Sequence, residues 1–491
     1  MPLNIGPGTE GLGLRAQIYK AFLDAIVDGR LSPGTRLPSA RELALEWHVS
    51  RNTVDEAIAQ LQSEGFVLRR VGSGSYIAHD IPGRGLRPAR ARVRPPAILG
   101  RKVLASVSAW SRTTSSAYAP DAAPRPQAFL AGLPALDLFP LDLWRRLVAR
   151  RLRSSGRHML GYFPSMGYLP LREATATHLA TTRDVICSPD QVMIVNSTMQ
   201  ALDLIARVLL EPGDKAWVED PCVPNLRAVL TVSGAQIVPV AVDEEGLQVQ
   251  QGIRVAPDAA LLYTTPSCQY PTGVALGVDR RLELLAWADR SGAWVVEDDY
   301  QSEFNYEGRP TTSLHSLNRG RRVLYLGTFT NSVFPSLRLA YMIIPKSLVP
   351  VFQAVRSQLD DHTHGLMQAV MADFADGGHF SAHLRRMRTI YQSRRDALVA
   401  ACARDLSKLA ILGSTTNGMS AALYLPSRIP DRAFAASLQG AAVRGLPLSR
   451  YAIGPRRPNG LLLGYTALSE RRIGASVARL AEAIAGFAPR S

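Results

Sequence analysis

From about residue 128 onward, short apolar runs alternate with segments of helical length, and this alternation limits the fold to few choices. Strands that alternate with helices along a chain build a mostly parallel sheet with helices on both faces. Ligands of such folds bind at the carboxyl ends of the strands and at helix N-termini. We therefore predict an α/β domain over residues 128–488. Its expected strands are residues 192–195, 215–218, 259–264, 293–296, 323–326 and 339–344, and its expected helices include residues 198–210, 280–291 and 471–487.

The first eighty residues predict a separate α+β unit of three helices followed by a hairpin. The first helix carries apolar side chains at helical spacing. Ser39 precedes Glu42 by three residues, which is the spacing of a capping box, so a second helix is expected to begin there. Ser50 is placed to cap a third helix. The two strands are expected at residues 66–68 and 75–77, and the unit, a winged helix-turn-helix, is expected to span residues 10–79.

A helix-turn-helix binds double-stranded DNA by placing the N-terminal residues of its last helix in the major groove. Arg51 can pair with guanine and Asn52 with adenine, while short hydroxyl side chains reach phosphate or base. Basic side chains around the second helix contact phosphates and so position the unit. Gly74, at the tip of the hairpin, permits close approach of the backbone to the duplex. The candidate DNA-binding residues are therefore Arg36, Ser39, Arg41, Ser50, Arg51, Asn52, Thr53 and Gly74.

The net charge of +15 indicates either an anionic partner, most often nucleic acid, or a solvated basic surface. The four cysteines are widely spaced without a CxxC pair, which argues against a zinc site or disulfides and favours a reducing cytoplasm. No apolar run nears the roughly 20 residues that span a bilayer, and the N-terminus lacks the features of a secretory signal. Residues 80–127, rich in Pro and Arg, are expected to form a linker that either adds salt-dependent DNA affinity or acts as a spacer.

Four stretches of the N-terminal unit, residues 33–44, 49–54, 64–65 and 72–74, resemble the winged helix of the GntR family. The turns at the ends of the predicted strands resemble the landmarks of class I/II aminotransferases, in the order usual for them. The whole arrangement resembles the MocR/GabR subfamily of bacterial regulators. This resemblance implies a fold-type I aminotransferase domain with a smaller C-terminal α/β subdomain at about residues 375–488. It also implies pyridoxal phosphate as cofactor and a homodimer, with a head-to-tail arrangement as one option, on an operator with paired half-sites.

The resemblance assigns a cofactor pocket to particular residues. Asp298 stands where the family pairs an aspartate with the pyridine nitrogen, and Tyr300 where a tyrosine reaches the ring hydroxyl. Arg338 stands where an arginine holds the phosphate, and Tyr162 where a tyrosine reaches the phosphate across the dimer. The predicted pocket residues are Tyr162, Ser197, Thr198, Val223, Asp298, Tyr300, Thr328, Thr330, Asn331 and Arg338. No metal site and no catalytic residue are predicted.

Asn331 replaces the lysine that holds the cofactor covalently in the resembled family. An amide nitrogen is not nucleophilic, because its lone pair is delocalised into the carbonyl, so Asn331 can neither bond to the cofactor nor carry protons as transamination requires. Val223 stands at the place of the ring-stacking aromatic, and several such departures together favour natural divergence over one engineered substitution. The further departures are Ser197 in place of a glycine, Cys268 in place of a histidine, and Leu462 in place of the arginine that binds the substrate carboxylate. Arg456 or Arg457 could take the place of that arginine. Cys222 and Cys268 are expected to face the same pocket, as inert thiols rather than redox sensors.

These features predict a sequence-specific transcriptional regulator with a sensor domain that does no covalent chemistry. Three options for its ligand stay open: a vitamin B6 compound held without a covalent bond, another small anionic effector, or no ligand, with the domain serving as a dimer scaffold. The alternative functions are an aminotransferase with an attached DNA-binding unit and an architectural protein that binds DNA without sequence preference. Asn331 argues against the enzyme.

Overall fold

The computed structural model describes residues 13–70, 73–79, 128–154, 159–307, 312–438, 443–455 and 457–487. They fall into two compact units, divided between residues 107 and 108, and each unit is described by itself. The predicted linker, residues 80–127, and residues 71 and 72 of the predicted hairpin lie outside the described residues. No helix within the described ranges is long and apolar enough to cross a membrane.

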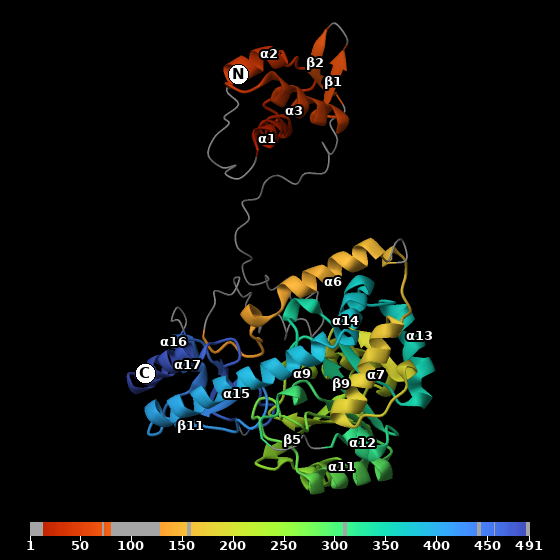
Figure 1. Ribbon diagram of the computed structural model, residues 1–491, viewed down its shortest axis with the longest axis vertical. Helices are drawn as coiled ribbons and strands as arrows, with labels where there is room; N and C mark the ends of the chain where they lie inside the picture. The colour runs from red at the N-terminus through yellow and green to blue at the C-terminus, as the bar shows by residue number, and fades with distance from the viewer. Residues whose placement is uncertain are drawn as a thin grey trace. The chain divides into compact units, whose positions relative to one another are not determined.

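The N-terminal unit consists of three helices and an antiparallel hairpin, as predicted (Figure 1). The capping box is confirmed, because Ser39 Oγ accepts a hydrogen bond from the Glu42 amide at 3.2 Å and the Glu42 carboxylate accepts one from the Ser39 amide at 2.8 Å. Ser50 caps the third helix, and its Oγ accepts a hydrogen bond from the Thr53 amide at 3.1 Å. Ile18 and Phe22 are fully buried between the helices. The elements are α1 (Leu14–Val27), α2 (Ala40–Glu46), α3 (Arg51–Ser63), β1 (Val67–Arg70) and β2 (Gly74–Ile77).

The large unit is built on an eight-stranded sheet within the described residues, in the order β3-β10-β9-β8-β7-β4-β5-β6. The strands from β9 to β5 are parallel, whereas β10 runs antiparallel to both of its neighbours and β6 antiparallel to β5. All six predicted strands are present. The strands are β3 (Val192–Val195), β4 (Lys215–Asp220), β5 (Gln236–Asp243), β6 (Gly246–Leu247), β7 (Leu261–Thr264), β8 (Trp294–Asp298), β9 (Val323–Thr328) and β10 (Ala340–Ile343).

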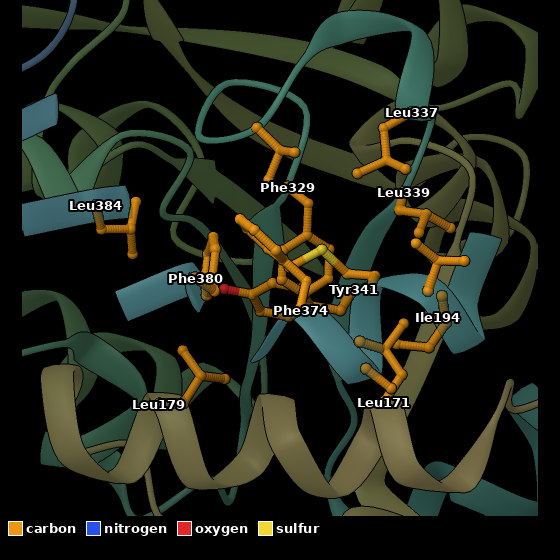
Figure 2. Close-up of a cluster of buried hydrophobic side chains, with 14 of the residues drawn as sticks. Leu171, Leu179, Ile194, Phe329, Leu337, Leu339, Tyr341, Phe374, Phe380 and Leu384 are labelled. Atoms are coloured by element: carbon orange, nitrogen blue, oxygen red, sulfur yellow. The ribbon is translucent and has the colours of Figure 1, made fainter. Parts of the chain in front are cut away.

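Helices cover both faces of this sheet because successive strand residues point to opposite sides. On one face Ile194 and Tyr341 pack with Phe329, Phe374 and Phe380, and Figure 2 shows these rings gathered over the helix that carries Leu171 and Leu179. On the other face the neighbouring residues of the same strands pack against α8, α9 and α13. The helices of this sheet are α6 (Leu141–Ser154), α7 (Leu169–Arg183), α8 (Thr198–Leu209), α9 (Pro224–Val232), α10 (Val249–Val255), α11 (Val278–Ser291), α12 (Leu314–Asn318), α13 (Val349–Leu359) and α14 (Gly365–Asp376).

The C-terminal part of the large unit has a small antiparallel sheet of its own, in the order β11-β12-β14-β13. Phe129, near the start of the described large unit, is buried in the core of this part, and Ala128 forms a β-bridge with Val443. The first described residues of the large unit therefore belong in space with its C-terminal elements. These are α15 (His379–Asp405), β11 (Ile411–Leu412), β12 (Ser420–Tyr424), α16 (Asp431–Ser437), β13 (Leu446–Pro447), β14 (Gly460–Gly464) and α17 (Glu470–Ala485).

Candidate functional site

A cavity of about 510 Å³ opens at the carboxyl ends of β8 and β9 and at the N-terminus of α8. Its size is typical of small-molecule sites. Nine of the ten pocket residues predicted from the sequence line it, and only Tyr162 does not. The described lining residues are Gly132, Ser197, Thr198, Met199, Val223, Asn225, Tyr263, Thr265, Tyr270, Asp298, Tyr300, Gln301, Thr328, Thr330, Asn331, Arg338 and Ser420.

Asp298, the last residue of β8, is the acidic group of the cavity. Its Oδ2 accepts a hydrogen bond from the Tyr263 hydroxyl at 2.7 Å, while its Oδ1 is buried and has no hydrogen-bond partner among the described residues. Burial raises the pKa of Asp298 to about 7, and the carboxylates of Asp299 and Glu219 add to the rise, against the hydrogen bond from Tyr263. An unpartnered buried carboxylate oxygen is costly, so this atom is suited to a ligand that brings a hydrogen-bond donor or a positive charge.

A second set of lining residues, at the N-terminus of α8 and at Arg338, is suited to an anion. The first amide groups of α8 have no partner within the helix, and the helix dipole favours negative charge at this end. Ser197 Oγ is already occupied, because it accepts a hydrogen bond from the Gln200 amide at 3.2 Å. Arg338 adds a positive charge and forms no ion pair with any described residue. Its backbone is left-handed, with φ of 52°, which is uncommon for residues other than glycine and is often found at functional sites.

Asn331 also lines the cavity. Its side-chain Nδ2 donates a hydrogen bond to the backbone carbonyl of Tyr300 at 3.2 Å. The amide is therefore both non-nucleophilic and held against the backbone. The Tyr300 hydroxyl points instead to the Cys268 sulfur, 3.8 Å away, and burial raises the pKa of Tyr300 well above its ordinary value. At neutral pH this hydroxyl keeps its proton.

Two expectations for the pocket were wrong. Neither Cys222 nor Cys268 lines the cavity, because Cys222 packs into the core beneath the sheet and Cys268 lies behind Tyr300. Burial raises the pKa of each thiol to about 12, so neither is a thiolate at neutral pH. Leu462 is fully buried against the small sheet and also lies outside the lining.

Other predicted residues stand apart from the cavity. Arg457 is exposed and does not line it, and Arg456 lies outside the described residues. Tyr162 has 92% of its surface exposed, and its ring contacts that of His362 with centroids 6.1 Å apart. In a single chain it therefore contributes nothing to the cavity.

Several lining residues were not predicted from the sequence. Tyr263 was included in an expected strand, but its contact with Asp298 depends on β7 lying next to β8. Gly132 and Ser420 come from segments far away in sequence, the latter from β12 of the small sheet. A local sequence pattern gives no signal for such residues, because only the tertiary fold brings them to the site.

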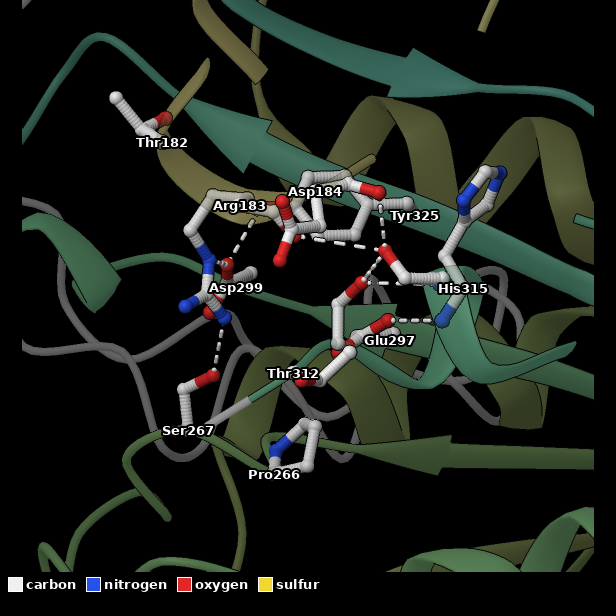
Figure 3. A network of polar contacts seen from close by, with 12 residues as sticks. Thr182, Arg183, Asp184, Pro266, Ser267, Glu297, Asp299, Thr312, His315 and Tyr325 are labelled. Carbon is white, nitrogen blue, oxygen red and sulfur yellow. Dashed lines mark hydrogen bonds and ion pairs between the residues drawn. The ribbon is translucent and has the colours of Figure 1, made fainter. Parts of the chain in front are cut away.

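A buried polar network fixes the strand end that carries Asp298. The residues on either side of it, Glu297 and Asp299, belong to this network (Figure 3). Because successive residues of a strand point to opposite sides, they face away from the side that carries Asp298. Asp299 accepts hydrogen bonds from Arg183, at 2.7 Å, and from the Tyr325 hydroxyl. Although burial opposes its ionisation, Arg183 holds the pKa of Asp299 below its ordinary value. Glu297 accepts hydrogen bonds from two backbone amides at the start of α12, at 2.9 and 2.8 Å. These contacts leave the Asp298 carboxyl little freedom to move.

The N-terminal unit has a separate cleft of about 760 Å³, lined by the basic side chains of Arg36, Arg41, Arg51 and Arg69. Asp55 lies between two of them, with its carboxylate 3.4 Å from Arg51 and 3.0 Å from Arg69. Both arginine side chains are more than half exposed, so they are held in place yet free to contact an anion. Arg69, on the first strand of the hairpin, was not among the residues predicted to bind DNA.

The other predicted DNA-binding residues divide by what their side chains do. The hydroxyls of Ser39 and Ser50 cap helices, and the Ser50 hydroxyl also bonds to that of Thr53 at 2.7 Å. Asn52 is exposed on the first turn of α3. Gly74 has φ of +111°, and a Cβ there would stand 3.2 Å from Arg36 Nε, so this position favours glycine.

Comparison with protein families matches residues 14–77 to the gntR family of bacterial regulatory proteins and residues 135–444 to aminotransferase class I and II. The probable rhizopine catabolism regulatory protein MocR of Rhizobium meliloti is 34% identical over 93% of this chain and 91% of its own. The chain belongs to the MocR-type GntR regulators. The regulator TauR of Rhodobacter capsulatus (31% identical) and the pyridoxine biosynthesis regulator PdxR of Corynebacterium glutamicum (28% identical) are similar over 98% or more of this chain and 98% of their own length. As a MocR-type protein, the chain is a DNA-binding transcriptional regulator.

Solved structures support the same assignment for the large unit. LysN of Thermus thermophilus, an alpha-aminoadipate aminotransferase complexed with N-(5′-phosphopyridoxyl)-L-leucine, matches with a TM-score of 0.68 and 29% identity over 73% of this chain and 92% of that one. A kynurenine aminotransferase of Pyrococcus horikoshii matches with a TM-score of 0.69 and 27% identity over 78% of this chain and 96% of that one. The MocR-type regulator therefore carries a fold-type I aminotransferase domain, a fold whose members bind pyridoxal phosphate.

Proposed function

We propose that this regulator senses a small anionic ligand of the pyridoxal phosphate class, held without a covalent bond, and that it has no transaminase activity. One observation carries the proposal. Among the described residues, the cavity has a buried, unpartnered carboxylate oxygen on Asp298 and an unpaired cation on Arg338, while Asn331 supplies no nucleophile. Asp298 and Arg338 can bind a ligand, but the cavity has no amine at Asn331 that could react with it.

The residues fit this class of ligand at each end. The protonated ring nitrogen of a pyridine would meet the free Oδ1 of Asp298, and its phosphate would lie between Arg338 and the N-terminus of α8. Val223 offers an apolar surface to the ring in place of a stacking aromatic. When bound to an enzyme, pyridoxal phosphate supplies an electron-withdrawing ring, but that chemistry needs an amine donor at the position of Asn331.

The test is calorimetric titration of the full chain with pyridoxal 5′-phosphate and pyridoxamine 5′-phosphate. We expect binding that dialysis reverses and that borohydride does not fix to the protein. Asn331→Lys should gain a yellow, borohydride-reducible bond, whereas the matched control Asn331→Gln should not. The proposal would be refuted if neither compound bound. It would also be refuted if borohydride fixed pyridoxal 5′-phosphate to the natural protein.

We infer that the regulator works as a homodimer on an operator with paired half-sites. The exposed apolar side chains Leu141, Leu152, Leu160 and Tyr162 provide surface for a second copy. On this proposal Tyr162 reaches the anion end of the partner's cavity. A native mass equal to one chain in the presence of operator DNA would contradict it, as would a footprint over a single half-site.

For the DNA contact we propose the basic cleft of the N-terminal unit, with Arg69 added to the residues named from the sequence. Asp55 orients Arg51 and Arg69 together, and the spacing of the two salt bridges supports this role. Footprinting on the promoter that flanks the gene tests specificity. A defined, repeated half-site supports a regulator, whereas uniform protection would support an architectural protein.

A further inference from the structure

Two acidic residues, Glu42 and Asp55, line the basic cleft of the N-terminal unit. Glu42 has a structural role there, because its carboxylate accepts the hydrogen bond from the Ser39 amide that completes the capping box. Asp55, the fifth residue of α3, caps no helix. Within the described residues, the partners of its carboxylate are Arg51 and Arg69. The presence of an acid among the arginines of a DNA-binding surface therefore needs another explanation.

The Asp55 carboxylate uses a different oxygen for each arginine. Its Oδ2 lies 3.4 Å from Nε of Arg51, which stands four residues earlier on α3 and so on the same face of the helix. Its Oδ1 accepts a hydrogen bond from Arg69, on β1, at 3.0 Å. Arg51 thus approaches the carboxylate through Nε, and its two terminal nitrogens stay available as donors. Arg uses such a pair of donors to bind guanine in the major groove.

The stability of the unit does not account for Asp55. Its side chain is 29% exposed, and those of Arg51 and Arg69 are 69% and 52% exposed. Ion pairs that are this open to water add little to stability, because solvent screens the charges and the side chains lose freedom. A carboxylate on a surface that binds DNA also repels the phosphates, and so lowers the affinity for DNA of any sequence. Any benefit of Asp55 must therefore concern which sequence is bound.

We propose that Asp55 determines the specificity of this regulator by positioning Arg51. An arginine on the first turn of α3 that is free to move also reaches phosphates, and phosphate contacts carry no sequence information. Held by Asp55, the Arg51 guanidinium presents its terminal nitrogens to the base edges in one orientation. Asp55 thus lowers the affinity for all DNA and raises the discrimination for guanine at the base pair that Arg51 contacts. The inference rests on the DNA contact proposed above and extends it to the origin of its specificity.

The test uses the natural full chain and a binding site selected with it from random duplex DNA. Arg51→Ala first identifies the guanine, as the base pair at which this variant loses discrimination. Fluorescence anisotropy then measures the affinity of Asp55→Asn for the selected site, for the site with that guanine replaced, and for unrelated DNA. We expect Asp55→Asn to bind unrelated DNA several-fold more tightly. Its discrimination at the guanine should fall by roughly tenfold, within the range that a bidentate pair of Arg with guanine provides.

Glu56→Gln is the matched control. It also removes one negative charge from α3, but Glu56 is exposed and does not line the cleft. This variant should keep the full discrimination at the guanine. If Asp55→Asn instead weakens the binding of all three DNAs equally, Asp55 only supports the fold and the inference is wrong. Unchanged discrimination in Asp55→Asn would overturn it as well.

The double variant Arg51→Ala/Asp55→Asn separates positioning from direct reading, because a carboxylate can itself accept a hydrogen bond from the amino group of cytosine. If Asp55 acts through Arg51, Asp55→Asn has no further effect on discrimination once Arg51 is replaced. A change of base preference that persists in the double variant refutes the inference, and so does an Arg51→Ala variant that loses discrimination at no base pair. Failure to select any site from random DNA overturns the proposed sequence-specific contact itself, which distinguishes the two proposals.

Discussion

The Asp298→Asn variant should gain stability relative to the natural protein as the pH rises from 5 to 8. Asp298 is 5% exposed, and burial raises its pKa from an ordinary 3.8 to about 7. Between these two values the folded state holds one more proton than the unfolded state, so the free energy of unfolding falls as the pH rises, and this loss is complete above the folded pKa. Within that window, the free energy of unfolding falls by about 1.4 kcal/mol for each pH unit. From pH 5 to pH 8 the difference between the two proteins should therefore widen by roughly 2 to 3 kcal/mol.

Urea denaturation at both pH values, followed by tryptophan fluorescence, measures this difference. Trp217 and Trp287 stack with ring centroids 3.8 Å apart in the same unit as Asp298, so they report its unfolding. The new amide also adds a cost wherever it lacks a partner, but that cost is the same at both pH values and cancels. Asp258→Asn is the control. Lys215 lowers the pKa of the exposed Asp258, so this variant should show no change between pH 5 and 8. An equally flat result for Asp298→Asn would refute the reasoning.

Three further substitutions test the remaining contacts. In calorimetry, Arg338→Gln should weaken the binding of pyridoxamine 5′-phosphate by roughly ten- to a hundredfold, which corresponds to the loss of about 1.5 to 3 kcal/mol for a hydrogen bond to a charged group. Unchanged affinity would show that the phosphate lies elsewhere. Arg183→Met should lower the free energy of unfolding by roughly 3 to 5 kcal/mol in a urea titration, because it leaves the Asp299 carboxylate buried without its cation. The control is Arg207→Met, at an exposed ion pair, which should lower it by less than about 1 kcal/mol. Arg69→Ala should weaken operator binding and reduce the slope of log affinity against log salt by about one ion, as measured by fluorescence anisotropy, and an unchanged slope would remove Arg69 from the phosphate contacts.

The sequence predicted the main strands because each contains a run of apolar residues that are buried on both faces of a mostly parallel sheet covered by helices. It did not predict β5 or β6. Pro239 interrupts β5, and most of that strand is only partly buried, so it lacks the continuous apolar character of its neighbours. With two residues, β6 is too short to produce a pattern at all.

The candidate site was predictable where its residues stand at strand ends or helix starts, and not where it depends on distant segments. Asp298 and Thr328 follow buried strands, so their position at one sheet edge could be expected. The contact of Tyr263 with Asp298 required the order of the strands, and Ser420 required the docking of the small sheet. The two cysteines were misplaced because sequence alone does not show to which side of a turn a side chain points.

The state of Asp298 distinguishes a binding domain from a scaffold. A scaffold gains nothing from a buried carboxyl group with one oxygen unpartnered, because such a group lowers the stability of the fold near neutral pH. A ligand that donates a hydrogen bond to that oxygen, or places a positive charge beside it, restores the lost stability. By thermodynamic linkage, this interaction also makes the ligand bind more tightly. On the proposed function this role does not depend on catalysis, since the Asn331 amide donates a hydrogen bond to the Tyr300 carbonyl and neither Asp298 nor Arg338 relies on it. The proposed regulator would therefore lack the covalent chemistry of the fold, and a bound ligand would still offset the cost of the buried Asp298 carboxyl group.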